Sequence, residues 1–339
     1  MGIKNLNKFI KKHFPEVIKT KPLKVIKDQR ISIDTSIFMW KYKLHSGGIN
    51  WLQYFFNLIQ LLRTNNIHPV FCFDGKAPAE KLDTQNERVE SRIKSRERIS
   101  HIENEYTNYL KTKQISDDLE AFCKRNNILL ENNVINEDKF YEKITSMKQN
   151  LDVKICKEDF ELLKEFLNDM KVPYITANGE AEMLCSDLCK NNKVDYVLSS
   201  DSDILAYGCP QSIFNINSQS QLIDIINYEE LLEKMELNKD EFLDLCIMFG
   251  TDYNKNIFKV GPETSFNLIK KHRNIDNIIE HDISILNHKK VRDLFNNHPI
   301  HTENIPYCDI PDFSVLNSKY NIQLPFNIEK KFKTTINFI

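Results

Sequence analysis

The sequence lacks the features that mark several large classes of protein. No hydrophobic stretch approaches the roughly 18 residues that a membrane helix needs, so we expect no integral membrane protein. Only 8 of the 339 residues are glycine and 11 are proline, which argues against a collagen-like or wholly disordered chain. The eight cysteines include no CxxC pair, and the start, MGIKNLNKFIKKHF, lacks the apolar core of a signal peptide. We therefore expect an intracellular protein with reduced cysteines.

The chain also lacks an overall excess of charge, because 46 Lys and Arg stand against 48 Asp and Glu. The balance is uneven along the sequence. Residues 1–30 carry nine basic and two acidic residues, a net +7, and residues 254–273 carry five and one, a net +4. Such basic segments suit contact with nucleic acid and equally suit solvated helix faces, so charge alone leaves both interpretations open.

Hydrophobic periodicity predicts an α/β protein. Short β-rich runs predict strands at 31–35, 69–74, 173–176, 195–200 and 212–216. Helical spacing predicts helices at 51–64, 158–171, 180–192 and 228–249, the last with a turn near Asn238. This alternation predicts parallel strands in one sheet. Residues 76–155 are strongly polar and predict a helical excursion from the core, partly disordered in 126–150, and the chain is expected to be irregular from about 275.

Acidic residues follow the predicted strands, at the edge where ligands bind in an open parallel sheet. They are Asp34, Asp74, Glu180, Glu182, Asp201 and Asp203. Residues two apart in a helix point away from each other, so Glu180 and Glu182 converge only if Glu180 lies before the helix or in its first turn. Asp201 and Asp203 are expected to share one side of an extended strand end.

Carboxylates held this close repel one another, and a divalent cation relieves the repulsion. Mg²⁺ and Mn²⁺ take oxygen ligands, and two such ions about 3.5–4 Å apart bind the attacking and leaving oxygens in phosphodiester hydrolysis. The pattern therefore favours a metal-dependent nuclease. Two other interpretations stay open: a phosphatase, which uses similar ions, and acids that only cap helices.

Six segments together resemble the flap endonuclease/XPG family of structure-specific 5′ nucleases. They are MGIKNL, DTSIFMWK, VFCFDGKAP, ANGEAEMLC, SSDSDILAYG and IMFGTDYNKNIFKVGPETSFNLIKKH. The resemblance implies a PIN-like (Rossmann-like) α/β nuclease core with a parallel-rich central sheet, a helical arch and a helix–hairpin–helix-type DNA clamp. We expect residues 1–100 to form the N-terminal nuclease region with the start of the arch, followed by the arch (101–155, partly disordered), the internal nuclease region (156–249), the clamp (250–275) and a C-terminal extension (276–339).

The resemblance also assigns roles to individual residues. It implies a first metal site of Asp34, Asp74, Glu180 and Glu182, and a second of Asp201, Asp203 and Asp252. The implied cofactors are two Mg²⁺ ions, with Mn²⁺ as a substitute. Lys81 and Arg88 match basic residues that contact the scissile phosphate in the family, and the alternative for Lys81 is an ordinary exposed lysine.

Further matches concern DNA binding. Trp40 falls where the family places a base-stacking tyrosine, with burial in the core as the alternative, and Gly2 resembles the family's processed N-terminal glycine. Residues 250–272 resemble the hairpin that binds duplex phosphates and K⁺, with the expected DNA contacts Gly250, Lys259, Gly261, Lys270 and Lys271. The family's Gly-hydrophobic-Gly pattern reads Lys259-Val260-Gly261 here, so the first glycine is missing.

The resemblance implies cleavage of 5′-flap or branched DNA by a two-metal mechanism in DNA replication or repair. The alternatives are a processive 5′→3′ double-strand DNA exonuclease of the same family and an inactive DNA-junction scaffold. We expect a monomer with no membrane partner. The C-terminal part shows no sliding-clamp sequence, so clamp binding is not predicted. The expected location is the nucleus, or a cytoplasmic replication site if the source is a large DNA virus.

Overall fold

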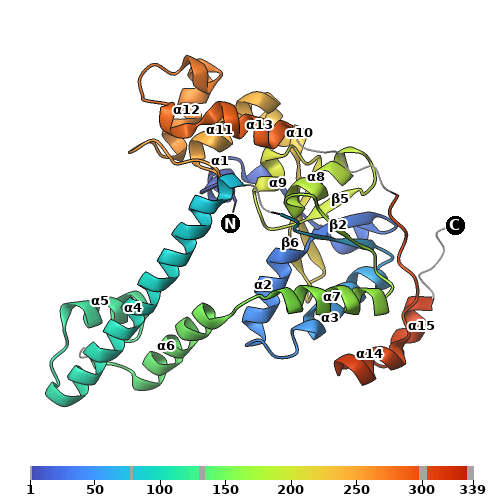
Figure 1. Cartoon of the computed structure of the whole chain (residues 1–339), viewed down its shortest axis with the longest axis horizontal. Helices are drawn as coiled ribbons and strands as arrows, with labels where there is room; N and C mark the ends of the chain where they lie inside the picture. The colour runs from blue at the N-terminus through green and yellow to red at the C-terminus, as the bar shows by residue number, and fades with distance from the viewer. Residues whose placement is uncertain (1, 77–78, 130–133, 298–303, 334–339) are drawn as a thin grey trace. The chain divides into compact units, whose positions relative to one another are not determined.

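The computed structural model describes residues 2–76, 79–129, 134–297 and 304–333 (Figure 1). Its contacts divide the chain into two compact units. Unit 1 comprises Met1–Tyr42, Asn50–Lys81 and Cys156–Ile339, and unit 2 comprises Lys43–Ile49 and Leu82–Ile155. No helix within the described ranges combines the length and the apolar character that crossing a bilayer requires.

Unit 1 is built on a seven-stranded sheet with the strand order β1-β7-β6-β5-β2-β3-β4. The strands are β1 Ile18–Pro22, β2 Arg30–Asp34, β3 His68–Phe73, β4 Tyr174–Thr176, β5 Tyr196–Leu198, β6 Gln211–Asn217 and β7 Leu222–Asn227. The strands from β4 through β3, β2 and β5 to β6 pair in parallel, whereas β7 and β1 pair antiparallel. The predicted α/β fold with a parallel-rich central sheet is confirmed.

The sequence predicted five of these strands and missed β1 and β7. In β1, with the sequence IKTKP, four of five residues are exposed, and the strand pairs with β7 at the edge of the sheet. Lysines and a proline are typical of an edge strand and leave no alternating hydrophobic pattern to find. β7 buries only two of its six residues, so its periodicity is weak as well.

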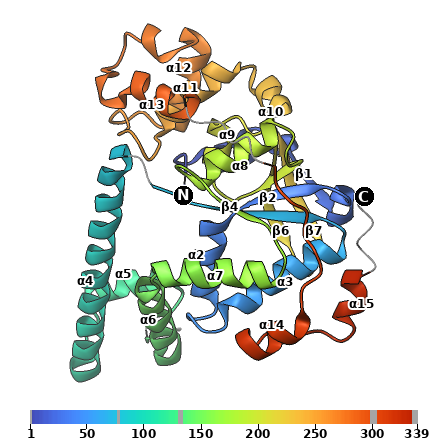
Figure 2. The ribbon, with the colours of Figure 1, turned by 45° about the vertical axis from the view of Figure 1, so that its right-hand side comes forward.

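Helices cover both faces of the sheet (Figures 1 and 2). On one face, α3 and α7 pack against β3: the ring centroids of Phe55 and Phe71 lie 5.9 Å apart, and those of Phe160 and Phe73 lie 6.2 Å apart. On the other face α8 is buried along nearly its whole length. The helices that lie wholly or mainly in unit 1 are α1 Leu6–His13, α2 Thr35–His45, α3 Trp51–Thr64, α7 Lys157–Asp169, α8 Ala181–Lys190, α9 Asp203–Ala206, α10 Tyr228–Met235, α11 Lys239–Phe249, α12 Pro262–His272, α13 His288–Asn296, α14 Phe313–Tyr320 and α15 Ile328–Lys333.

The predicted turn near Asn238 is confirmed. Asn238 caps α11, where its side chain accepts from the N–H of Glu241 at 3.0 Å, and Glu241 accepts in return from the N–H of Asn238 at 2.8 Å. This reciprocal pair satisfies two backbone donors at the helix start. It separates α10 from α11, so that α11 leads toward Asp252.

Unit 2 is helical, as the polar composition predicted, and has its own core. It contains α4 Leu82–Thr112, α5 Asp117–Arg125 and α6 Glu137–Asp152. Its buried residues form a separate cluster in which the rings of Tyr106 and Phe140 stack with centroids 3.9 Å apart. Within 126–150, where we expected partial disorder, residues from Glu137 onward are helical, and residues 130–133 lie outside the described part of the chain. The main segment of unit 2 begins at Leu82, within the residues 1–100 that we expected to include the start of the arch.

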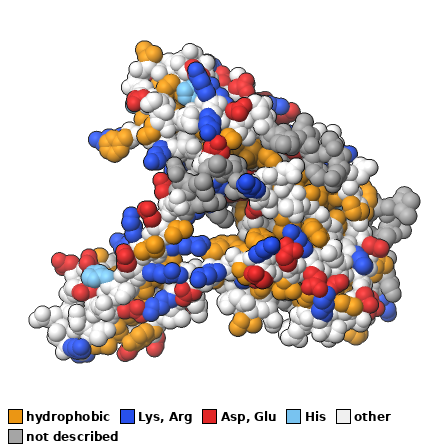
Figure 3. All heavy atoms as spheres, viewed as in Figure 1, with side chains coloured by type: hydrophobic (Ala, Val, Ile, Leu, Met, Phe, Trp, Pro, Cys, Tyr) orange, Lys and Arg blue, Asp and Glu red, His pale blue; other side chains and the backbone are white. Residues whose placement is uncertain are grey.

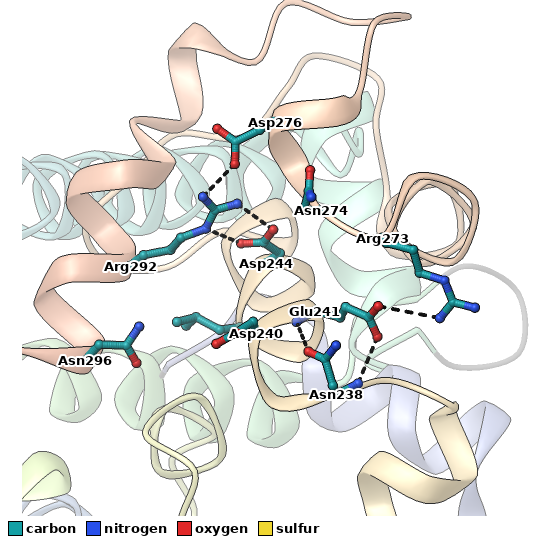
Figure 4. Close-up of a pocket in the computed structure, with 10 residues that line it drawn as sticks. Asn238, Asp240, Glu241, Asp244, Arg273, Asn274, Asp276, Arg292 and Asn296 are labelled. Carbon is teal, nitrogen blue, oxygen red and sulfur yellow. Dashed lines mark hydrogen bonds and ion pairs between the residues drawn. The ribbon is translucent and has the colours of Figure 1, made fainter.

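The chain beyond 275, which we expected to be irregular, forms further helices, and α13 is tied to α11 by an ion-pair cluster. Arg292 on α13 donates to both carboxylate oxygens of Asp244 on α11 at 2.6 Å and to Asp276 at 2.7 Å (Figure 4). His288 also contacts Asp276, at 2.9 Å. These hydrogen bonds lower the pKa of Asp276 to about 2. We call Asp244, Asp276, His288 and Arg292 the Arg292 cluster; it borders a polar cavity of about 420 Å³.

Candidate active site

The ends of β2 and β5 bring Asp34 and Asp201 to one edge of the sheet. β2 ends at Asp34, which is fully buried and accepts a hydrogen bond of 3.0 Å from Ser199 Oγ. The same Ser199 Oγ accepts from the backbone N–H of Asp201 at 3.0 Å. Because β2 and β5 are parallel neighbours, Ser199 links the two acids across adjacent strand ends.

Asp74 follows β3 and links that strand to the start of α8. Its Oδ1 accepts from the N–H of Ala181 at 2.8 Å, and its Oδ2 accepts from Ser36 Oγ at 2.5 Å. Gly75 lets the chain after β3 lie close to the segment before α8, because a Cβ at this position would be 2.0 Å from the carbonyl oxygen of Ala177. The end of β3 and the first turn of α8 therefore lie side by side.

Glu180 precedes α8, as its convergence with Glu182 requires. Glu180 is the N-cap residue with extended backbone (φ −89°, ψ 147°), and Glu182 lies in the first turn. The Glu180 carboxylate is held on both sides: Lys81 Nζ donates to its Oε1, and the hydroxyl of Tyr253 donates to its Oε2. The prediction that Glu180 lies before the helix or in its first turn is confirmed.

Asp201 and Asp203 lie close together, but our expectation of an extended strand end was wrong. β5 ends at Leu198, and Asp203 begins the short helix α9. Asp201 lies in the connecting loop, where its Oδ1 accepts a 3.1 Å hydrogen bond from the N–H of Asp203. Side-chain bonds to the backbone replace the strand ladder here, and hydrophobic periodicity does not report such bonds.

Lys81 lies among these acids together with Asp252. Its Nζ is 3.4 Å from Asp252 Oδ2, in addition to its bond with Glu180, and its side chain is 15% exposed. Burial alone would lower the pKa of Lys81, but the carboxylates of Glu180, Glu182 and Asp252 outweigh burial and raise it. Lys81 is therefore a protonated, partly buried residue of the acidic cluster rather than an ordinary surface lysine.

The carboxylates are more crowded than their protein partners can neutralise. Burial, with repulsion from Asp74 and Asp201, raises the pKa of Asp34 to about 8. Burial and neighbouring acids also raise the pKa values of Glu182 and Asp203. Among the described residues, the Oδ1 atoms of Asp34 and Asp203 are buried and have no hydrogen-bond partner. Buried anionic oxygens without donors are costly, so the cluster suits a cation.

The donor set fits hard divalent ions. Seven acidic side chains supply carboxylate oxygens, the ligands that Mg²⁺ and Mn²⁺ prefer: Asp34, Asp74, Glu180, Glu182, Asp201, Asp203 and Asp252. Within the described ranges, no three acidic, histidine or cysteine side chains already surround one point closely enough to hold an ion. The division of the seven acids into two metal sites stays a prediction.

Sequence reasoning missed three residues that position the acids. Ser36 and Ser199 donate to Asp74 and Asp34, and Tyr253 donates to Glu180. The hydroxyl of Tyr253 also lies 3.4 Å from that of Tyr207. Tyr253 directly follows Asp252 and Ser36 comes two residues after Asp34, so proximity to predicted ligands was an available signal.

The predicted DNA contacts outside the hairpin have different surroundings. Gly2 has φ 78°, and a Cβ there would lie 1.8 Å from Asp201 Oδ1, so only glycine fits against the cluster. Trp40 is half-buried in α2. Arg88 is an exposed residue of α4 in unit 2, where Figure 3 shows other Lys and Arg side chains along the helix. Their contacts with DNA stay predictions.

The hairpin between α11 and α12 keeps a glycine-like backbone at the position where the family glycine is missing. Lys259 has φ 61°, in the left-handed region. Gly250, with φ 101°, ends α11, and a Cβ on it would lie 2.3 Å from Asn256 Oδ1. Gly261 caps α12 and has nothing within 4 Å of an added Cβ, so the start of α12 is open to a ligand.

Two predicted DNA-binding lysines of α12 have partners within the protein. Lys270 pairs with Glu236, and Lys271 Nζ lies 2.5 Å from Glu280 Oε1. Both ion pairs involve exposed carboxylates, so they weaken but do not remove the attraction of these lysines for phosphate. Lys259 instead extends over the ring of Phe258, with Nζ 5.2 Å from the ring centroid.

Comparison with protein families gives two matches. The XPG N-terminal domain matches residues 1–95, and the XPG I-region matches residues 171–252. The chain is 33% identical to a probable RAD2-like endonuclease of Invertebrate iridescent virus 6, over 96% of this chain and 89% of that protein. It is 32% identical to flap endonuclease 1 of Debaryomyces hansenii, over 83% of this chain and 69% of that protein.

Solved structures show the same fold. The catalytic core of Rad2 in complex with DNA substrate aligns with a TM-score of 0.68 at 19% identity, covering all of both chains. Flap endonuclease-1 from Methanococcus jannaschii aligns with a TM-score of 0.60 at 19% identity, covering 96% of this chain and 97% of that one. The family matches and the sequence relatives, whose fold these structures share, show that the chain belongs to the flap endonuclease/XPG family of structure-specific nucleases.

Proposed function

We propose that this nuclease hydrolyses phosphodiester bonds of 5′-flap or branched DNA in replication or repair, with two Mg²⁺ ions that Mn²⁺ can replace. The observation that carries the proposal is the buried carboxylate cluster, with the raised pKa values of Asp34, Glu182 and Asp203. Close packing of buried carboxylates is unfavourable when the acids serve only the fold, because their charges repel one another. Divalent cations relieve this repulsion and take carboxylate oxygens as ligands. The family relationship to flap endonuclease 1 supports the DNA substrate.

Two ions held by these carboxylates would supply a water-derived nucleophile at neutral pH and stabilise the leaving oxygen of the phosphodiester. The chain's own residues orient the reaction. Asp34, Asp74 and Glu180 are fixed by Ser199, by Ser36 and by Tyr253. Lys81 keeps its proton, so its ammonium group can stabilise negative charge on the phosphate in the transition state. Attack of water at phosphorus, with the P–O3′ bond broken and the 3′ oxygen leaving, would release a 5′-phosphate and a 3′-hydroxyl.

The duplex arm of the substrate would dock on the hairpin and the start of α12. Backbone N–H groups at a helix N-terminus bind phosphate without reading sequence. The open Gly261 and the left-handed Lys259 provide the close approach that such binding needs. We also propose that the hairpin binds K⁺ together with the duplex. Measuring DNA affinity in KCl and in a salt of a larger monovalent cation tests this, and weaker binding in the second salt is the expected result.

The test is Mg²⁺-dependent cleavage of an end-labelled 5′-flap duplex by the wild type and by Asp201→Ala. A single product cut near the junction, absent with the variant, supports the proposal. A ladder that shortens from the 5′ end would instead support a processive 5′→3′ exonuclease. DNA binding without cleavage in Mg²⁺ or Mn²⁺ would contradict a working site and favour a junction scaffold.

The same proposal covers partners and place of action. We expect a monomer that acts wherever its DNA is replicated, in a nucleus or at a cytoplasmic viral replication site, and does not need a sliding clamp. Sedimentation of the purified chain, alone and with a flap duplex, tests the monomer. A dimer under both conditions would contradict it.

A further inference from the structure

The hairpin between α11 and α12 exposes a large aromatic side chain. Phe258 is 83% exposed, whereas Val260, two residues later, is 8% exposed and belongs to the core cluster of unit 1. Ile257, just before it, is half-buried against the same cluster. The two flanking aliphatic residues therefore anchor the hairpin, and Phe258 and Lys259 project from it. Figure 3 shows hydrophobic and basic side chains projecting together from the loop beside α12.

The hairpin is held in place by side-chain amides, so the exposure of Phe258 is built into the fold. Asn256 Nδ2 donates to the carbonyl oxygens of Met248 (3.3 Å) and Phe249 (2.5 Å) at the end of α11. Asn256 Oδ1 accepts from Lys4 Nζ at 3.0 Å, and the backbone N–H of Lys4 donates to Gly250 at 3.0 Å. These bonds satisfy helix-terminal carbonyls and tie the N-terminal segment to the hairpin.

The surroundings of Phe258 are basic. Lys255 and Lys259 are exposed on the hairpin, and Lys4 lies beside it. The nearest acid in the α12 sequence, Glu263, lies 2.7 Å from Lys12 and 2.6 Å from His13, so its charge is offset. An aromatic ring among exposed ammonium groups matches a nucleic acid duplex, which offers apolar sugar faces and base edges between phosphates.

We propose that Phe258 is a DNA-contacting residue of this nuclease: its ring packs against deoxyribose and base edges in the minor groove of the duplex arm, while Lys259 contacts an adjacent phosphate. This rests on the proposed function and adds to it an apolar contact in a hairpin otherwise expected to bind only phosphates. Burial of the ring on DNA also removes a large exposed hydrophobic side chain from water.

The test compares four variants by fluorescence anisotropy with a labelled 5′-flap duplex in Ca²⁺, across a range of salt concentrations. Phe258→Ala should raise Kd about tenfold, near the lower end of the range for one aromatic contact, and leave the salt dependence unchanged because no ion pair is lost. Lys259→Ala should lower the slope of log Kd against log salt by about one. Phe258→Trp, which keeps a ring, should bind nearly as the wild type does.

Phe326→Ala is the matched control, because Phe326 is 89% exposed and lies outside the hairpin. It should bind DNA as the wild type does. Equal Kd values for Phe258→Ala and Phe326→Ala would overturn the proposal, as would a Phe258→Ala effect that disappears at high salt in the manner of a lost ion pair. Cleavage of the flap duplex by the wild type separates this failure from failure of the proposed function. Equal Kd values for the two alanine variants with an active wild type would overturn only the role of Phe258, whereas an inactive wild type would refute the function itself.

Discussion

Unit 1 contains two groups of buried acids that differ in how their charge is balanced. At the sheet edge, Asp34 and Asp203 each bury an oxygen without a hydrogen-bond partner among the described residues, and their pKa values are raised. In the Arg292 cluster, Asp244 is only 2% exposed, yet both its oxygens bind the Arg292 guanidinium at 2.6 Å (Figure 4). One helix, α11, carries Asp244 and leads to Asp252, so the two groups share a scaffold.

The difference separates an acid used for stability from an acid used for chemistry. A structural carboxylate is given a cation by the fold, because a buried unpaired charge costs several kcal/mol. At the sheet edge, the ammonium of Lys81 contacts Glu180 and Asp252, while the Oδ1 atoms of Asp34 and Asp203 have no hydrogen-bond partner among the described residues. The remaining negative charge is available to external cations, which is the condition for a metal-dependent site.

The largest expected effect is loss of cleavage in Asp34→Asn. We expect the single-turnover rate to fall by about 10³-fold, equivalent to about 4 kcal/mol in the barrier, because a neutral amide cannot replace a charged ligand. The melting temperature in EDTA should not fall, because burial and neighbouring acids already disfavour the charged form of Asp34 and a neutral amide takes its place. Addition of Mg²⁺ should raise the melting temperature of the wild type more than that of the variant.

A melting temperature for Asp34→Asn well below that of the wild type would contradict the distinction between the two acidic groups, because it would show that Asp34, like Asp244, stabilises the fold. Asp195→Asn is a control that makes the same change from acid to amide. Asp195 accepts a hydrogen bond of 2.8 Å from the backbone N–H of Arg30 and is not one of the predicted ligands, so this variant should cleave at the wild-type rate.

Arg292→Met should do the opposite, lowering stability without removing catalysis. We expect the free energy of unfolding to fall by about 3 kcal/mol, which is at the lower end for a broken buried ion pair. The loss is no larger because Asp244 still accepts a hydrogen bond of 2.9 Å from the N–H of Ile275. Urea unfolding measures it. The double variant Arg292→Met with Asp244→Leu should recover much of the loss, since it leaves no buried charge unpaired.

If the double variant were no more stable than Arg292→Met, the loss would come from packing of α13 rather than from the charge of Asp244. Cleavage below the melting temperature should stay near the wild-type rate in both variants. A large fall in rate there would show that the two acidic groups are coupled through α11.

Tyr253→Phe should have a smaller effect, confined to metal use. The variant keeps the ring but loses the hydroxyl that donates to Glu180, so Glu180 is held by Lys81 alone among the partners described. We expect the Mg²⁺ concentration for half-maximal rate to rise about tenfold, with the rate at saturating Mg²⁺ changed less, as is typical for residues that orient a ligand. Tyr207 contacts the hydroxyl of Tyr253 rather than Glu180 itself, so Tyr207→Phe should raise the Mg²⁺ concentration for half-maximal rate by less.

The sequence predicted most of this arrangement because the strands β2, β3 and β5 are buried and the acids follow their ends. Continuous hydrophobic runs identify such strands, and the position of Asp34 or Asp74 at a strand end follows directly. β1 escaped prediction because four of its residues are exposed, and the loop that joins Asp201 to Asp203 escaped because side chains rather than periodicity define it. Long-range partners such as Tyr253 and Arg292 carry no local pattern.

The smallest expected effect is the pH dependence of the Arg292 cluster. The pKa of Asp276 is lowered from 3.8 to about 2, chiefly by hydrogen bonds from His288 and Arg292. A lowered pKa in the folded state means that the stabilisation is complete above about pH 4 and is lost as the pH falls toward 2. Because the Asp276 side chain is 39% exposed, we expect no more than about 1 kcal/mol. The difference in unfolding free energy between the wild type and Asp276→Asn should therefore shrink toward zero between pH 4 and pH 2; a difference that stays constant over this range would show that Asp276 acts through its shape rather than its charge.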